Sequence, residues 1–241
     1  MDFALSGEQR ALAEMAAAFA RREILPEAAR LDREARFPRE LFARARELGL
    51  TALAMPEAYG GLGLGRLELV LAAEQMAWAC AGVTAALLLN HLVADAFLVG
   101  AEEELRRTYV GRLAAGELGA YALTEPEAGS DVAGIRSRAV RRGDRYLLSG
   151  SKIWISNATE ASFFVVFAKT DPAAGRRGLS AFVVERGTPG LEVGPPLPKM
   201  GQRAAPAAPL YLDGVQVPAA QRLGEEGEGF LLAMRVFDRS R

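Results

Sequence analysis

The chain has 241 residues, of which 50% are hydrophobic and 24% charged, a composition typical of globular proteins with one large or two modest domains. Its 29 basic and 30 acidic residues give a formal net charge of −1, so it has no excess positive charge to hold a nucleic acid backbone. The single cysteine, Cys80, excludes an internal disulfide, and the single histidine, His91, leaves too few ligands for an ordinary zinc site.

Helical patterns occupy the first half of the chain. Ser6 followed by Gln9 makes a capping box, and apolar residues then recur at helical spacing until Pro26 interrupts the pattern. A further helix should begin near Pro38 and end at Gly49, because proline suits a first helical turn and glycine suits a C-cap. Three more helices are expected, at 67–80, 83–99 and 102–113.

The segment 83–99 is the most apolar part of the chain. It is short for a membrane span and contains Asn90, His91 and Asp95, so we expect a buried helix. His91 has no partner at the spacing of a metal site or catalytic triad, which favours a core histidine over a catalytic one. The opening residues lack the features of a secretory signal, and we expect a cytoplasmic protein without a membrane span.

Short apolar runs separated by turn residues follow Gly116 and predict strands. The runs are 118–123, 146–148, 153–155, 163–168, 179–184 and 210–217. The segments 142–144 and 213–214 have the composition of hairpin turns, and the proline-rich segment 195–198 predicts a loop. From Gly229 the apolar residues return to helical spacing.

A glycine cluster at 60–65 could suggest a phosphate-binding loop. No strand precedes it, however, and no Lys-Ser/Thr pair follows, so a turn between helices is the favoured interpretation.

Two segments carry the signals for chemistry. In YALTEPEAGSD (121–131) a strand runs into a tight turn of small residues, which can aim backbone N–H groups and a hydroxyl at an anion. In Trp154-Ile155-Ser156, strand alternation would place Trp154 and Ser156 on one face, with Ile153 and Ile155 on the other. A large aromatic side chain beside a hydroxyl suits a flat heteroaromatic ring. Taken alone, however, the first segment is equally compatible with an ordinary turn, and Trp154 is more typical of a core residue.

Five segments, in order and spacing, resemble the motifs of the acyl-CoA dehydrogenase family. They are MPEAYGGLGLG (55–65), YALTEPEAGSDVAGI (121–135), GSKIWISNA (150–158), KMGQR (199–203) and LGEEGEGF (223–230). The resemblance implies an α+β multidomain fold. Its parts would be an all-helical N-terminal domain (1–117), a middle β-barrel domain (118–228) and the first turns of a truncated C-terminal helical bundle (229–241).

The resemblance further implies FAD-dependent dehydrogenation of an acyl-CoA thioester to a trans-2-enoyl-CoA, with electrons passed to an electron-transfer flavoprotein. The implied cofactor-binding residues are Tyr121, Ala122, Leu123, Thr124, Gly129, Ser130, Trp154, Ile155 and Ser156. Ser130, Asp238 and Arg241 are the implied substrate-binding residues. Most relatives have threonine where this chain has Ser156, which keeps the hydroxyl but loses the methyl group that fixes the rotamer.

The catalytic base implied by the resemblance is a glutamate. One branch of the family places it just before the arginine equivalent to Arg241, where this chain has Ser240. We therefore expect the base beyond Arg241, a full-length homodimer or homotetramer, and no activity from residues 1–241 alone. Two alternatives stay open: a flavin oxidase or monooxygenase of the same fold, and an inactive fragment. The length and branching of the acyl group also stay open.

Overall fold

A computed structural model describes residues 4–240 of the chain. The described residues form two compact units, and each is treated separately below. The first unit is helical and contains residues 4–91, 114–116 and 198–206. The second unit contains residues 92–113, 117–197 and 207–240, and its centre is a β-sheet.

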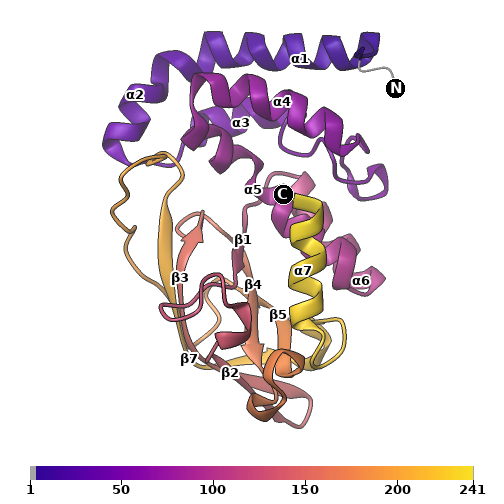
Figure 1. The fold of residues 1–241 in the computed structure, drawn as a ribbon, viewed down its shortest axis with the longest axis vertical. Coiled ribbons are helices and arrows are strands. Elements are labelled where there is room, and N and C mark those ends of the chain that lie inside the picture. The colour runs from indigo at the N-terminus through magenta and orange to yellow at the C-terminus, as the bar shows by residue number, and fades with distance from the viewer. Residues whose placement is uncertain (1–3, 241) are drawn as a thin grey trace. The chain divides into compact units, whose positions relative to one another are not determined.

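The helices of the first unit are α1 (Gly7–Phe19), α2 (Leu25–Glu34), α3 (Arg39–Glu47), α4 (Arg66–Ala79) and the first part of α5 (Ala81–Gly100). The capping box is confirmed, because the Gln9 N–H donates to Ser6 Oγ at 3.1 Å and the Ser6 N–H donates to Gln9 Oε1 at 2.9 Å. Figure 1 shows α1 beside α4. The expected interruption at Pro26 is wrong, because the backbone is helical from Gly7 to Glu34. A π-helical turn at Ala20–Ile24 joins α1 to α2, and Pro26 lies in the first turn of α2.

The glycine cluster at 60–65 is a loop that leads into α4, as predicted. The N–H groups of residues 62–64 donate to carbonyls in residues 52–55, at N···O distances of 2.8–3.1 Å. A Cβ atom at Gly61 would lie 2.1 Å from the Met55 carbonyl oxygen. The loop therefore uses its N–H groups within the fold, and Gly61 permits the close approach of two backbone segments.

His91 is a buried core residue on α5, which confirms the sequence interpretation. The Ala54 N–H lies 3.3 Å from His91 Nε2, and His91 Nδ1 lies 3.2 Å from the Leu88 carbonyl oxygen. An Nδ1–H tautomer satisfies both contacts, because Nε2 then accepts and Nδ1 donates. Burial lowers the pKa of His91 to about 4, so the imidazole is neutral at pH 7.

Helix α5 is long and apolar enough to cross a membrane by composition, but 67% of its apolar window is buried in the structure. It is a core helix, as expected. Helix α6 (Glu103–Ala114) follows it.

The second unit contains eight strands in its described residues. They are β1 (Gly119–Ala122), β2 (Arg138–Arg142), β3 (Arg145–Ser156), β4 (Phe163–Lys169), β5 (Leu179–Glu185), β6 (Leu191–Val193), β7 (Ala207–Pro218) and β8 (Arg222–Leu223). The sheet order is β6-β7-β3-β2-β4-β5-β8, and β1 pairs in parallel with β4. Helix α7 (Gly229–Ser240) follows β8 and lies along β5 (Figure 1).

Two predictions about turns have different outcomes. The segment 142–144 does join β2 to β3 as a hairpin, and Gly143 takes a φ of 63°. The hairpin predicted at 213–214 is wrong, because β7 continues through it. Gly214, with a φ of 63°, sits where the pairing of β3 with β7 shifts register, so the glycine serves a bulge. Similarly, the predicted strands 146–148 and 153–155 are parts of one strand, β3.

Of the expected middle β-barrel domain the structure shows a mixed sheet, and the described strands leave it open, with β6 and β8 at its ends. A single residue pair, Arg138 with Lys169, joins β2 to β4. The strands on both sides of this narrow junction contribute to one core, where the Tyr146 and Phe182 rings lie 4.8 Å apart. The sheet thus packs around a shared core without closing, and its end strands have only three and two residues.

Candidate functional site

The site begins where the chain leaves β1 and runs beside β3, within the second unit. The Ile153 N–H donates to the Thr124 carbonyl at 3.0 Å. Lys152 Nζ donates to the Leu123 carbonyl at 3.2 Å and to Glu125 Oε1 at 2.6 Å. These three bonds bring together the two segments that the sequence singled out for chemistry.

A bulge in β3 determines how Trp154 is presented. Lys152 pairs with Leu210 and Ile155 pairs with Ala208, so β3 carries one extra residue here. Trp154 has a φ of 61°, a left-handed conformation that is rare for a large side chain. The bulge interrupts the alternation expected for 153–156, and it leaves Trp154 52% exposed.

The other residues expected to bind a cofactor differ in exposure. The side chains of Ala122, Leu123 and Ile155 are buried, so these residues can offer only backbone groups. Tyr121, Thr124 and Ser156 are half-buried, and Gly129 and Ser130 are exposed. The contacts above join 123–125 to 152–153, whereas no described contact joins Ser130 to Trp154.

Two charged residues at the centre of this arrangement escaped the sequence analysis. Lys152 is fully buried, and Glu125 is 4% exposed. The Glu125 carboxylate also accepts the N–H groups of Arg136 at 2.6 Å and Ser137 at 3.1 Å. Charged residues usually lie at the surface, so the only available signal was a lone lysine between the predicted apolar strands 146–148 and 153–155.

Each charge of the Lys152–Glu125 pair stabilises the ionised form of the other group. Burial alone would raise the pKa of Glu125, but the Lys152 charge and the hydrogen bonds from Lys152, Ser137 and Arg136 lower it overall. Burial lowers the pKa of Lys152 to about 8, and the Glu125 charge opposes that change. Both groups are therefore ionised at pH 7.

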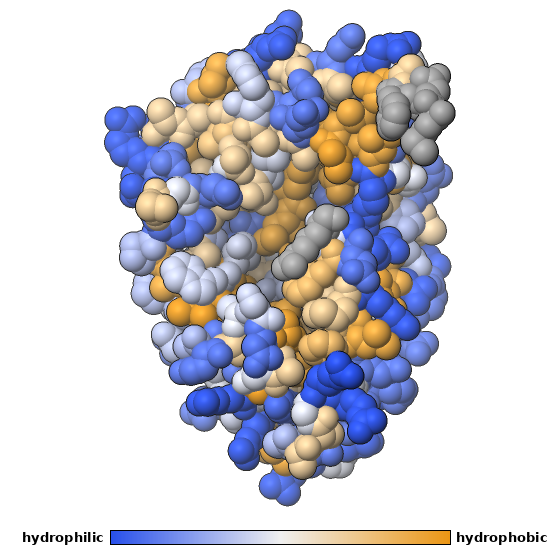
Figure 2. Space-filling view, in the orientation of Figure 1, coloured by the Kyte–Doolittle hydropathy of each residue, from blue (hydrophilic) through white to orange (hydrophobic). Residues whose placement is uncertain are grey.

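Aromatic rings line the site on the side of α7. The Tyr121 ring centroid lies 5.0 Å from that of Phe167 and 6.1 Å from that of Phe237 on α7. The Tyr121 hydroxyl is buried and has no hydrogen-bond partner among the described residues, and burial raises its pKa. Asp238 is exposed on α7, whereas Arg241 lies outside the described residues. Figure 2 shows apolar surface along α7 with charged residues beside it.

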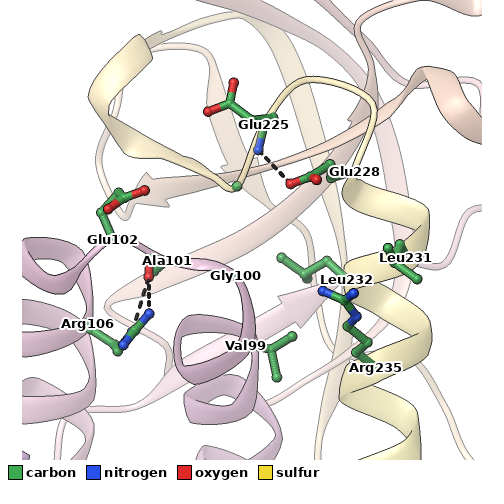
Figure 3. A pocket seen from close by; sticks show the side chains of 11 residues that line it. Val99, Gly100, Ala101, Glu102, Arg106, Glu225, Glu228, Leu231, Leu232 and Arg235 are labelled. Atoms are coloured by element: carbon green, nitrogen blue, oxygen red, sulfur yellow. Dashed lines mark hydrogen bonds between the residues drawn. The ribbon is translucent and has the colours of Figure 1, made fainter.

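A pocket of about 270 Å³ lies at the start of α7 (Figure 3). Its lining combines acidic and basic groups with apolar side chains: Val99, Gly100, Ala101, Glu102, Arg106, Gly224, Glu225, Glu228, Leu231, Leu232 and Arg235. None of the residues expected to bind cofactor or substrate lines it. Within residues 4–240, no group of three or more His, Cys, Asp or Glu side chains is placed to hold a metal ion.

Trp154, Ser156 and the segment 121–124 form a candidate binding face, and its chemistry suits a flat heteroaromatic group. The half-exposed Trp154 indole offers a stacking surface, Ser156 carries a hydroxyl two residues away, and the segment 121–124 supplies backbone groups. A bound molecule could also supply a partner for the buried Tyr121 hydroxyl.

Comparisons with known proteins bear on this face. The family description "Acyl-CoA dehydrogenase, N-terminal domain" matches residues 6–117, and "Acyl-CoA dehydrogenase, middle domain" matches residues 120–215. The acryloyl-CoA reductase (NADH) of Anaerotignum propionicum is 42% identical over 100% of this chain and 62% of its own length.

Two solved structures are also similar. Butyryl-CoA dehydrogenase from Megasphaera elsdenii has a TM-score of 0.92 and 36% identity, over 99% of this chain and 64% of that one. A chain in a structure of the electron transferring flavoprotein of Acidaminococcus fermentans has a TM-score of 0.93 and 38% identity, over 99% of this chain and 63% of that one. The chain thus spans a little under two thirds of the length of these relatives.

Proposed function

Because the chain belongs to the acyl-CoA dehydrogenase family, we propose that it forms the flavin-binding part of an enzyme that oxidises an acyl-CoA thioester to a trans-2-enoyl-CoA. The cofactor is FAD. The names of two relatives, acryloyl-CoA reductase and butyryl-CoA dehydrogenase, support a thioester of coenzyme A as the substrate class.

The observation that carries the proposal is the Trp154 bulge beside the segment 121–124. When bound there, FAD supplies the hydride acceptor for the β-carbon of the substrate. Trp154 and the backbone of 121–124 would hold the ring of the cofactor. Ser156 would donate a hydrogen bond from its hydroxyl to the ring, and the exposed turn at Gly129 and Ser130 would bind the pyrophosphate.

In this proposal Ser130, Asp238 and Arg241 bind the acyl-CoA. Asp238 follows Phe237 on α7, and the Phe237 ring centroid lies 6.1 Å from that of Tyr121. Glu125 is not the catalytic base, because Lys152 and two backbone N–H groups occupy its carboxylate. Ser240 has no carboxylate, so neither residue can remove the α-proton.

The proposed electron acceptor for this enzyme is an electron-transfer flavoprotein. The similarity to a chain in the Acidaminococcus fermentans structure supports this partner class. We further propose a cytoplasmic enzyme that works as a homodimer or homotetramer, with domain boundaries near residues 117 and 228.

The test uses the protein expressed from its gene through the natural stop codon. It should copurify with FAD, and anaerobic addition of a straight-chain or branched acyl-CoA should bleach the oxidised flavin. Failure to bind FAD would reject the proposal. Rapid oxygen consumption during turnover, with no need for an electron-transfer flavoprotein, would instead identify a flavin oxidase.

A further inference from the structure

We propose that the buried Lys152–Glu125 ion pair is a positioning device, which sets the direction of the backbone groups that face the flavin. The inference rests on the proposed function for its consequence in catalysis. Its structural part concerns only contacts within the second unit.

Lys152 fixes the peptide group between Leu123 and Thr124. Lys152 Nζ holds the Leu123 carbonyl oxygen at 3.2 Å on the buried side. In a trans peptide the N–H points opposite to the C=O, so the Thr124 N–H is directed away from Lys152. No group among residues 4–240 accepts a hydrogen bond from this N–H, and Thr124 itself is half-buried. Lys152 therefore directs this backbone donor away from the buried side of the segment 121–124.

The Lys152 charge also strengthens the Thr124 N–H as a hydrogen-bond donor. A cation bound to a carbonyl oxygen polarises the peptide group, and hydrogen bonds in such a chain reinforce one another. Lys152 is fully buried, so little solvent screens its charge at the Leu123 carbonyl, and the Glu125 carboxylate at 2.6 Å offsets part of that charge. The Thr124 N–H consequently donates more strongly to a ring acceptor than an ordinary backbone amide does.

The Glu125 carboxylate holds the loop that contains Ser130. Glu125 opens this loop, and the N–H groups of Arg136 and Ser137 close it on the same carboxylate. One side chain thus fixes both ends of a loop of about ten residues, while Lys152 fixes that side chain to β3. Movement of the pair would move the ring-facing segment and the Ser130 turn together.

Stability alone is a weak explanation for this arrangement. Replacing a buried ion pair with apolar groups of similar volume is often neutral for folding, because desolvation offsets the attraction between the charges. Removing one partner is costly, since it leaves a buried charge without compensation. A variant that neutralises both groups can therefore separate positioning from folding.

The test compares the parent with the double variant Lys152→Met/Glu125→Gln in the full gene product. The control is Arg112→Met/Glu185→Gln, which neutralises another ion pair of the second unit, with a shortest N···O distance of 2.6 Å. We measure thermal unfolding, amide hydrogen exchange of residues 121–137, the midpoint potential of bound FAD, and flavin reduction over a range of acyl-CoA concentrations.

The Lys152/Glu125 variant should unfold within a few degrees of the parent, yet exchange amides in 121–137 about tenfold faster. Its flavin should have a lower midpoint potential, because the donor that stabilises the reduced ring is weakened. Flavin reduction at saturating acyl-CoA should fall about tenfold, with less change in the half-saturating concentration. The control variant should match the parent in exchange over 121–137, potential and rate.

Parental exchange over 121–137 in the folded Lys152/Glu125 variant would overturn the positioning role, and so would a parental potential and reduction rate. If the double variant does not fold, Glu125→Asp replaces it, because this change keeps the charge and shortens the reach of the carboxylate. Glu125→Asp should also speed exchange and slow reduction, and parental values would again overturn the proposal. A parent without FAD would reject the proposed function, while hydrogen exchange would still test the positioning role.

Discussion

Replacement of Trp154 by alanine should weaken FAD binding far more than it weakens folding. The residue is 52% exposed, so a ring stacked on it could cover about half of the roughly 250 Å² of an indole side chain. At about 25 cal/mol per Å², covering about 130 Å² stabilises the complex by about 3 kcal/mol. The Kd for FAD should therefore rise about 150-fold in Trp154→Ala. Folding should change by only about 1 kcal/mol, since half of the side chain already contacts water.

The assay is FAD titration of the apoprotein, followed by flavin fluorescence, with thermal unfolding measured in parallel. Trp154→Phe keeps an aromatic surface and should retain most of the affinity. Trp78→Ala removes another exposed tryptophan, 67% exposed and in the first unit, and should leave the affinity unchanged. An unchanged Kd in Trp154→Ala, or an equal loss in Trp78→Ala, would refute the assignment of the flavin to this face.

Three further predictions concern other parts of the chain. Because the pKa of His91 is about 4 when folded and about 6.5 when unfolded, its contribution to stability is complete above pH 6.5 and is lost as pH falls toward 4. The free energy of unfolding, measured with urea, should fall by about 2 kcal/mol between pH 7 and pH 5, and His91→Gln should lack this fall. An equal pH dependence in the two proteins would contradict the prediction. Ser156→Ala should slow flavin reduction about tenfold in stopped-flow absorbance and change FAD affinity less, whereas an unchanged rate would count against its hydroxyl. Gly61→Ala should lower the melting temperature sharply, because its Cβ would meet the Met55 carbonyl at 2.1 Å, while Gly7→Ala, with no atom within 4 Å of its Cβ, should not.

Local patterns predicted the helical elements and one hairpin turn well. The capping box at Ser6 and Gln9 and the turn residue Gly143 each specify one local geometry, which the structure contains. The segment 213–214 has the composition of a hairpin turn but forms a bulge instead, because pairing with β3 over a long register overrides local turn preference. The missed strand β2 has no apolar alternation, since its residues at 138–142 are mostly exposed arginines.

The sequence predicted which segments belong to the candidate site but not how their side chains are arranged in space. The motifs indicated Trp154 and the segment 121–124, yet the bulge depends on pairing between β3 and β7, which no short window of sequence contains. Lys152 and Glu125 are 27 residues apart, and their burial follows only from the contact between two strands. A lysine inside an apolar strand and a glutamate after a strand exit each look like solvated residues until the fold brings them together.

The most direct test of the central claim is an anaerobic titration of the purified full gene product with acyl-CoA substrates. The account predicts that the FAD bound beside Trp154 loses its oxidised absorbance as acyl-CoA is added, with formation of the enoyl-CoA in equal amount. Flavin that stays oxidised with every acyl-CoA tested, in a protein that binds both molecules, would contradict the account.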